Sequence, residues 1–357
     1  MRRSFLKTAL RSWRCRRHHQ PILTTALRGL STVQVASGSA ASYDIDTFRK
    51  AAFTQEKPFH FKNDGGIHGD GDRSLPAARK WFSLDETSSP AADMTLSPYL
   101  VKFSDDAPFP YELYSPPPSS ADSKSPVAAF CEWLSRSEDF QDQILAGILH
   151  AITAGGPGGG AGEGFFQLQA PLQLLAKALL FNRDQVSTGL QPLLLYVAQS
   201  SVSDLPQPLQ ADLPTPSLVR KSGKGDVYGS SIWIGTEPTY TPLHRDPNPN
   251  LFCQLHSQKV IRLLPPQLGE RIFFEVQTQL RRRGGGSSRM RGTEMMEGTE
   301  RALLYEAVWA DGKLADKFQQ AELDTGDSLF IPKGWWHSVK SIGSSGALNA
   351  SVNWWFR

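Results

Sequence analysis

The sequence predicts a mainly β fold with a helical N-terminal part, built around a jelly-roll barrel. Apolar residues at helical spacing end near residue 197. From Tyr228 onward, short apolar segments are separated by Gly, Pro and Asn, and the candidate strands are residues 232–234, 251–255, 260–264, 328–331 and 350–356. Many short strands late in a chain are typical of a jelly roll.

Length and composition indicate one large domain with a leader. The 357 residues exceed the usual domain of about 100 to 200, but barrels often reach about 250 as one unit. A hydrophobic fraction of 39% with 19 Phe builds a sizeable core, which excludes a disordered protein. The three cysteines form no zinc-finger or disulfide spacing, so we expect a reduced protein inside the cell. The sequence contains no run of 18 apolar residues, so no membrane span is predicted.

Basic residues are concentrated at the start of the chain. Eight of the 38 precede the first acid, Asp44. This distribution predicts a mitochondrial presequence over residues 1–30, a linker over 31–44 and a protein of the matrix. A basic tail on a cytoplasmic or nuclear protein is the alternative. Without those eight residues, 30 basic side chains face 35 acidic ones, so a general affinity for nucleic acid is not expected.

We expect one domain over residues 45–357. Residues 45–190 are predicted to be a mixed, helical support, with one or two helices between Val127 and Ala154 and another over 170–180. Residues 191–357 are predicted to form the barrel core. A polar, glycine-rich stretch predicts an inserted loop at about 267–300. Its basic part, from Arg281 to Arg291, fits either recruitment of an acidic partner or a solvated surface.

The metal-binding candidates begin with His244 and Asp246, which follow a predicted strand. In an extended chain, residues i and i+2 project from the same face, so this imidazole and carboxylate are able to bind one ion. The pair alone is a weak signal, because a histidine beside a turn aspartate is common. A third ligand is predicted from residues 326–337, where a turn precedes an apolar strand, Pro and Gly bend the chain, and His337 follows.

Two histidines and one carboxylate form the facial triad of non-haem iron. That arrangement leaves positions for a bidentate cosubstrate and dioxygen. Zinc enzymes also combine two histidines with a carboxylate, so the three residues leave a zinc-dependent hydrolase or isomerase open.

Stretches around the triad follow the pattern of a known family. They are WIG at 233–235, TPLHRD at 241–246, Lys259, LPP at 264–266 and GDSLFIPKGWWH at 326–337. Together they resemble the JmjC oxygenases, in particular their small, single-domain hydroxylase branch. The resemblance is strong from about Leu193 to Arg357 and weak before it. It implies a double-stranded β-helix, or cupin barrel, that holds Fe(II) through His244, Asp246 and His337 and uses 2-oxoglutarate and O2.

The resemblance also implies which residues bind 2-oxoglutarate. Lys259, fifteen residues after His244, stands where the family pairs an ammonium with the distal carboxylate. Thr241 hydrogen-bonds the same carboxylate, provided that the strand alternates regularly through Pro242. Further pocket positions are Tyr196, Asn250 and Asn353. Taken singly these residue types are ordinary, because tyrosines and asparagines near a barrel usually satisfy local hydrogen bonds.

The implied activity is hydroxylation of a protein side chain, with succinate and CO2 as coproducts. The same site serves a lysine demethylase or an RNA-base hydroxylase, and a catalytically silent cupin-like metal binder is the alternative from another class. A protein substrate is expected as the partner, and the resemblance leaves a homodimer open.

Aromatic residues surround the motifs and are predicted to pack in the core, since aromatics at strand spacing more often do so than line an entrance. They are Trp335, Trp336, Trp354 and Trp355. His60 and His256 have no partner at a ligand spacing and receive no role.

Overall fold

The computed structural model describes residues 31–64, 74–84, 94–115, 124–154, 164–185, 191–282, 298–310 and 315–357. The predicted presequence over residues 1–30 and most of the arginine-rich stretch, residues 283–297, lie outside the described residues. Among the described residues, no helix is long and apolar enough to cross a membrane.

Strands dominate the second half of the chain and also occur before it. The strands are β1 (Ser31–Thr32), β2 (Gln34–Ser37), β3 (Phe59–Lys62), β4 (Phe82–Leu84), β5 (Met94–Leu96), β6 (Pro108–Ser115), β7 (Gly164–Pro171), β8 (Leu194–Ser201), β9 (Val227–Thr236), β10 (Tyr240–Arg245), β11 (Asn250–His256), β12 (Lys259–Leu264), β13 (Gln319–Leu323), β14 (Ser328–Ile331), β15 (Trp336–Ser341) and β16 (Leu348–Phe356). The five strands expected in the second half are all present, as parts of β9, β11, β12, β14 and β16.

Helices flank the strands. They are α1 (Ile45–Phe48), α2 (Pro76–Lys80), α3 (Pro98–Val101), α4 (Pro126–Ser135), α5 (Phe140–Ala154), α6 (Gln173–Gln185), α7 (Gln207–Ala211), α8 (Ser217–Lys221), α9 (Pro266–Arg282) and α11 (Thr299–Trp309), with the short turns η2 (Arg49–Phe53), η4 (Val202–Asp204) and η5 (Ala315–Lys317). The stretch from Val127 to Ala154, expected to form one or two helices, forms α4 and α5, and the helix expected over 170–180 corresponds to α6.

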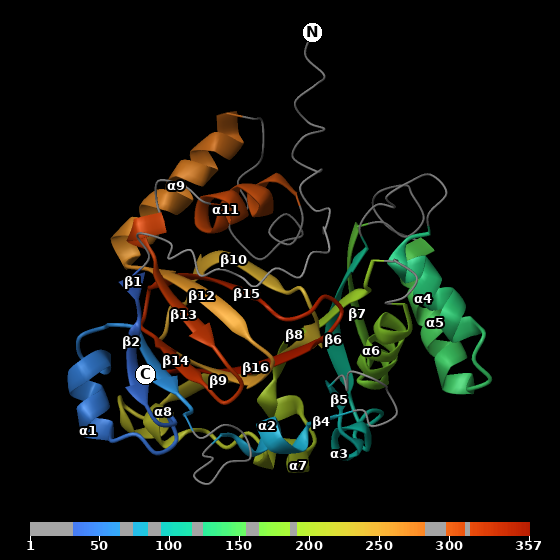
Figure 1. The fold of residues 1–357 in the computed structure, drawn as a ribbon, viewed down its shortest axis with the longest axis horizontal. Helices are drawn as coiled ribbons and strands as arrows, with labels where there is room; N and C mark the ends of the chain where they lie inside the picture. Colours follow the sequence, from blue (N-terminus) through green and yellow to red (C-terminus); the bar gives the residue numbers. More distant parts are fainter. Residues whose placement is uncertain are drawn as a thin grey trace, which may run out of the picture.

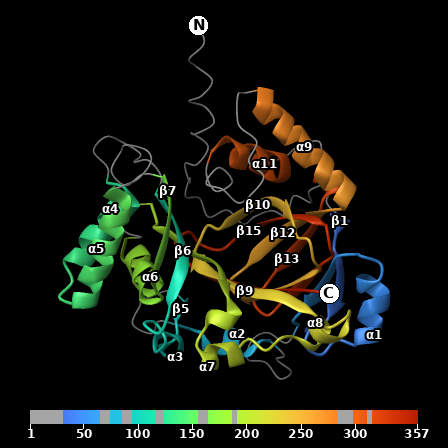
Figure 2. The same cartoon turned by 180° about the vertical axis from the view of Figure 1, so that it is seen from behind.

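Two sheets form the barrel. The smaller has the strand order β1-β13-β12-β15-β10, and the larger has the order β2-β3-β14-β11-β16-β9-β8-β6-β7. Figure 1 shows them facing each other at the centre of the molecule, with α9 and α11 on one side and α4, α5 and α6 beyond β6 and β7. The view from behind in Figure 2 shows the same arrangement. The predicted mainly β, jelly-roll fold is therefore confirmed.

The two faces of the smaller sheet pack against different partners. Residues directly opposite in a strand pair share a face, so the pairings of β12 place Ile261 beside Val339 and Leu263 beside His337. Ile261, Leu263 and Val339 belong to the apolar cluster inside the barrel. The alternate residues Val260 and Leu264 belong to a second cluster under α9 and α11. Because both faces are covered, all six residues of β12 are buried.

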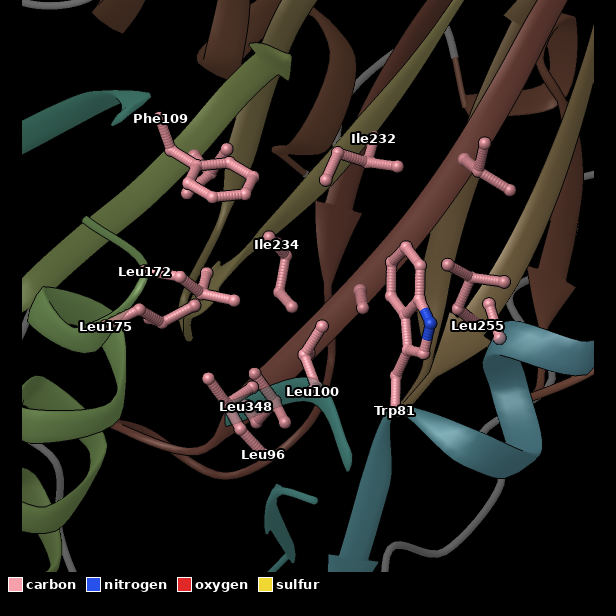
Figure 3. Packing of buried hydrophobic residues seen from close by; sticks show 14 of the residues in the cluster. Trp81, Leu96, Leu100, Phe109, Leu172, Leu175, Ile232, Ile234, Leu255 and Leu348 are labelled. Atoms are coloured by element: carbon pink, nitrogen blue, oxygen red, sulfur yellow. The ribbon is translucent and has the colours of Figure 1, made fainter. Parts of the chain in front are cut away.

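The larger sheet turns its outer face to the main core. Alternate residues of β9 and β16, such as Ile234 and Trp354, are buried there against the helices of the first half. Figure 3 shows Trp81, at the end of α2, Leu175 of α6 and Ile234 of β9 in this core. The intervening residues of the same strands, such as Trp233 and Asn353, point to the inner face and line the barrel.

The structure corrects one expectation about organisation. Residues 266–282, expected within an inserted loop, form helix α9, because Ile272, Val276 and Leu280 recur every four residues and are buried under it. The part expected to be a mixed, helical support, 45–190, contributes strands β3, β6 and β7 to the larger sheet beside its helices.

We expect the cover formed by α9 and α11 to be part of the cooperative fold. Leu304 of α11 is fully buried against the barrel, whereas Phe274 of α9 is 66% exposed. Leu304→Ala should lower the free energy of unfolding by about 2 to 5 kcal/mol, because it leaves a cavity. Phe274→Ala should change it by about 0.5 kcal/mol or less. Urea denaturation measures both, and equal effects would contradict the packing described here.

Candidate functional site

The three predicted metal ligands meet at one end of the barrel. In the antiparallel pair of β10 and β15, His244 lies directly opposite His337, and their ring centroids are 4.1 Å apart. Asp246 follows β10, and its Oδ2 is 3.7 Å from His337 Nε2. One ligand atom from each of the three residues lies within 4.8 Å of the other two. Residues about ninety positions apart in sequence therefore form one cluster of two imidazoles and a carboxylate.

Backbone carbonyls orient both imidazoles. His244 Nδ1 is 2.9 Å from the oxygen of Pro242, and His337 Nδ1 is 3.2 Å from the oxygen of Trp335. A carbonyl oxygen only accepts a hydrogen bond, so each neutral ring carries its proton on Nδ1. The lone pair is then on Nε2 of both rings. This backbone hydrogen bond is the usual device by which proteins fix a metal-binding histidine.

Neighbouring side chains hold Asp246 as a carboxylate. Burial alone would raise its pKa, but the positive charge that the adjacent imidazoles of His337 and His244 carry when protonated and hydrogen bonds from Trp355 and Asn250 outweigh burial, so the pKa lies below its usual value. Asn250 Nδ2 donates to Asp246 Oδ2 over 3.0 Å. The other amide atom, Asn250 Oδ1, is buried and has no hydrogen-bond partner among the described residues. It is thus available to a ligand beside the metal cluster.

Lys259 lies deeper in the barrel and is 2% exposed. Its Nζ donates to Ser351 Oγ over 2.7 Å and to Tyr196 Oη over 3.2 Å. Burial lowers the pKa of Lys259 to about 7, although the negative charge of Glu237 acts in the opposite direction. Among the described residues Lys259 forms no ion pair, so its charge has no direct counterion there. Such a buried amine is a strong binding position for a carboxylate.

A glycine allows Tyr196 to lie against the barrel wall. Tyr196 is opposite Gly235 in the pairing of β8 and β9. A Cβ atom at Gly235 would be 2.6 Å from Tyr196 Cδ2, closer than two carbon atoms normally approach. Close packing against Tyr196 thus explains why the last residue of the WIG stretch is a glycine. Burial raises the pKa of Tyr196 far above its usual value, so the hydroxyl stays protonated and able to hydrogen-bond.

A bulge decides the direction of Thr241. Thr241 is opposite Val339 and His244 is opposite His337, so three positions of β10 span two positions of β15. Regular alternation through Pro242, which we expected, would put Thr241 and His244 on opposite faces. The extra residue places both on the face of Val339, inside the barrel. The expectation of regular alternation was wrong, but the predicted direction of Thr241 agrees with the register.

Asn353 is also on the inner face. It is 3% exposed, and its Oδ1 accepts a hydrogen bond of 2.9 Å from Trp233 Nε1. Asn353 lies opposite Phe252, which belongs to the cluster inside the barrel. The eight residues predicted to bind metal or 2-oxoglutarate therefore all belong to strands of the two barrel sheets, or directly follow one of them.

Two inner residues of β16 were missed in the sequence. Trp355, expected only to pack, hydrogen-bonds Asp246, and Ser351 accepts from Lys259. Both lie two positions from Asn353 in the same strand and therefore share its face, so counting alternate residues from Asn353 would have identified them. Trp335, Trp336 and Trp354 are buried in apolar clusters, as expected.

The two histidines without a predicted role lie apart from the cluster. His60 Nε2 is 3.0 Å from Asp327 Oδ2, which ties β3 to the turn before β14. His256 packs against the ring of Phe82, and burial lowers its pKa to about 4. Asp327 of the GDSLFIP stretch thus stabilises a turn and does not join the three metal-ligand candidates.

Comparison with known proteins places the chain in a family. Residues 152–357 match the family described as "Cupin-like domain". The chain is 28% identical over 185 residues to "Lysine-specific demethylase JMJ30" of Arabidopsis thaliana, which covers 52% of this chain and 38% of that protein. It is 29% identical over 163 residues to "Lysine-specific demethylase 8" of Danio rerio, with coverage of 45% and 36%.

A third relative is similar to the chain at nearly the same identity and coverage. The chain is 29% identical over 164 residues to "Jumonji C domain-containing protein 5" of Drosophila melanogaster, covering 45% of this chain and 36% of that protein. The matched part therefore spans little more than a third of the length of these three relatives. Because the family match takes in more than half of the chain and includes the whole His-Asp-His cluster, this protein belongs to the cupin-like domain family, with JmjC proteins among its relatives.

Proposed function

We propose that this protein is an Fe(II)- and 2-oxoglutarate-dependent oxygenase that hydroxylates a protein side chain. One observation carries the proposal: the same barrel interior holds a cluster of two imidazoles and a carboxylate and, separately, a buried lysine that has no ion pair among the described residues. A metal site alone would fit many activities. The addition of a buried cation favours a ligand that chelates the metal at one end and carries a carboxylate at the other.

The donor set fits ferrous iron. Two neutral imidazoles with Nε2 lone pairs and one ionised carboxylate are the ligands of the facial triad, which leaves the remaining positions to other ligands. Zinc accepts the same donors. The buried amine of Lys259 favours the oxygenase, because a zinc-dependent hydrolase has no need of a pocket for a dicarboxylate.

The residues of the chain contribute binding and orientation. Iron with 2-oxoglutarate and O2, when bound, supplies the oxidising power for hydroxylation of a C–H bond. An ammonium has three N–H donors, and Lys259 gives two of them to Ser351 and Tyr196. The third remains for the distal carboxylate, with the Thr241 hydroxyl as a second donor. Asn250 and Trp355 hold the Asp246 carboxylate in one orientation, so the cluster is preorganised.

A lysine demethylase is the second candidate, because two of the relatives carry that description. Hydroxylation of an N-methyl carbon uses the same site, so the barrel interior fits either outcome. A comparison of proteomes with and without the active protein distinguishes them. Gain of about 16 Da, one oxygen atom, on an unmethylated side chain supports hydroxylation, whereas loss of methyl groups from lysine supports demethylation.

The metal cluster generates the first prediction. His337→Ala should lower iron affinity and abolish succinate formation from 2-oxoglutarate, by at least about 100-fold, since it removes one of three ligands. His150→Ala, on the exposed side of α5, is the matched control and should retain activity. Turnover that continues without O2, or that is undiminished in His337→Ala, would rule out the oxygenase.

Lys259 generates a prediction about stability. Its amine has a pKa of about 7 in the folded protein and about 10.5 ordinarily, so the unfavourable burial of the charge is greatest below pH 7 and disappears as the pH rises toward 10.5. Lys259→Met should therefore raise the free energy of unfolding near neutral pH, on the order of a few kcal/mol, and this gain should shrink at higher pH.

The same variant should lose 2-oxoglutarate binding, which isothermal titration calorimetry measures. Lys62→Met is the control, because that lysine is half exposed and its ion pair with Asp324 contributes little. A less stable Lys259→Met protein that still binds 2-oxoglutarate would contradict both parts of the prediction.

We also propose that the protein acts in mitochondria, on the basis of the basic leader over residues 1–30. A tagged full chain should reach the mitochondrion, and the same chain without residues 1–30 should not. Microscopy of both in one cell type tests this. Import of the shortened chain would remove the support for a presequence.

A further inference from the structure

A buried acid lies at the inner end of the barrel, where neither the metal cluster nor the 2-oxoglutarate pocket uses it. Glu237 directly follows β9 and is 1% exposed. Two backbone hydrogen bonds hold Glu237 in place: its N–H donates to the Ala347 carbonyl, and its backbone carbonyl accepts from the Gly346 N–H. An ionisable group at this depth needs partners, because burial disfavours the charged form.

The Glu237 carboxylate is bound through one oxygen. Ser257 Oγ donates to Oε1 over 2.6 Å, and Asn349 Nδ2 donates to the same oxygen over 2.9 Å. The second oxygen, Oε2, is buried and has no hydrogen-bond partner among the described residues. Both of these hydrogen bonds to the Glu237 carboxylate therefore reach the same oxygen, Oε1.

Both partners of Glu237 are neighbours of the Lys259 site. Ser257 precedes Lys259 by two residues, and Asn349 precedes Ser351, the acceptor of the Lys259 ammonium, by two residues on the same inner face of β16. The buried carboxylate and the buried ammonium are thus bound by Asn349 and Ser351, whose Cα atoms are one strand repeat apart, roughly 7 Å. The two charges attract each other, and no hydrogen bond joins them among the described residues.

The surroundings of Lys259 contain few other charges. Tyr196 from β8 stays neutral, and Phe252 from β11 and Ser351 from β16 are uncharged. Across the sheet Lys259 is opposite Ser341 of β15 and Leu323 of β13, also uncharged. Asp324, next to Leu323, is half exposed and is bound by Gln258 and Lys62. Glu237 is buried, and its negative charge acts on the Lys259 ammonium against the effect of burial.

We propose that Glu237 is a positioning residue for 2-oxoglutarate: it keeps Lys259 in the ammonium form while leaving the third N–H of that ammonium for the ligand. The inference rests on the proposed function and extends it to a residue outside the binding pocket. A direct ion pair would occupy the donor that the ligand requires. A carboxylate that acts without a direct hydrogen bond stabilises the same charge and leaves the donor available.

Replacement of the charge at constant shape tests the proposal. In Glu237→Gln of the full chain, the titration midpoint of Lys259 should fall by about one pH unit, which corresponds to about tenfold less ammonium above the midpoint. Carbon-13 NMR of the lysine Cε, assigned with Lys259→Met, reports this midpoint without 2-oxoglutarate. Calorimetry under anaerobic conditions should show 2-oxoglutarate affinity falling about tenfold at pH 8, with a smaller loss at pH 6.

Two further variants separate charge from structure. Ser257→Ala removes a hydrogen bond to Glu237 but keeps its charge, so the Lys259 midpoint should stay within a few tenths of a unit. The double variant Glu237→Gln/Asn349→Asp exchanges the acid and the amide across their hydrogen bond and should move the midpoint back toward that of the unchanged chain. A merely structural role of Glu237 predicts no such rescue.

The outcomes are distinguishable. An unchanged midpoint in Glu237→Gln, or an equal shift in Ser257→Ala, would overturn the role of Glu237. Failure of the unchanged chain to bind 2-oxoglutarate would instead overturn the proposed function, and the lysine titration would still show whether Glu237 controls the charge. A lowered midpoint that the double variant restores, together with pH-dependent loss of affinity, would establish the proposal.

Discussion

The register between β10 and β15 is the constraint on which the site depends. It places His244 opposite His337, and the bulge between Thr241 and His244 turns both of these β10 residues toward the barrel interior. Side chains in a strand alternate between faces, so a slip of one residue would move the whole inner set to the outer face. The apolar clusters on the two sides of the smaller sheet oppose that slip, because each face has a covered, well-packed partner.

The barrel interior combines an apolar layer with a layer of polar residues that is unfavourable for stability. Lys259, Glu237 and Asn353 are each at most 3% exposed. Burial of such groups destabilises a fold unless hydrogen bonds or charges compensate. Part of the compensation is internal, through Ser351, Asn349 and similar neighbours on β16. Within the part of the chain that the structure describes, the remainder is an ammonium without a direct counterion and an amide oxygen without a hydrogen-bond partner. This arrangement is expected where a ligand completes the network.

The first half of the chain supports this interior although the family match begins at residue 152. Strands β2, β3 and β6 precede that point, yet they belong to the same nine-stranded sheet as β11 and β16. β6 pairs along β8, the strand that carries Tyr196, and β3 covers the edge of β14. The helices α4, α5 and α6 then bury the outer face of that sheet. Tyr196 is thus flanked on one side by β6, which precedes the family match, and on the other by β9, which lies within it.

The sequence by itself determined the barrel class, the three metal-ligand candidates and Lys259, because short strands with HxD and a distant His after a Pro-Gly bend form a local pattern readable along the chain. It missed helix α9, although Ile272, Val276 and Leu280 recur every four residues along it. Only the tertiary structure decided the Thr241 bulge and the roles of Trp355 and Glu237, for one physical reason. A bulge, a hydrogen bond to Asp246 and a carboxylate beside Lys259 each depend on which strands become neighbours, and residues more than ninety positions apart become neighbours only in the folded chain.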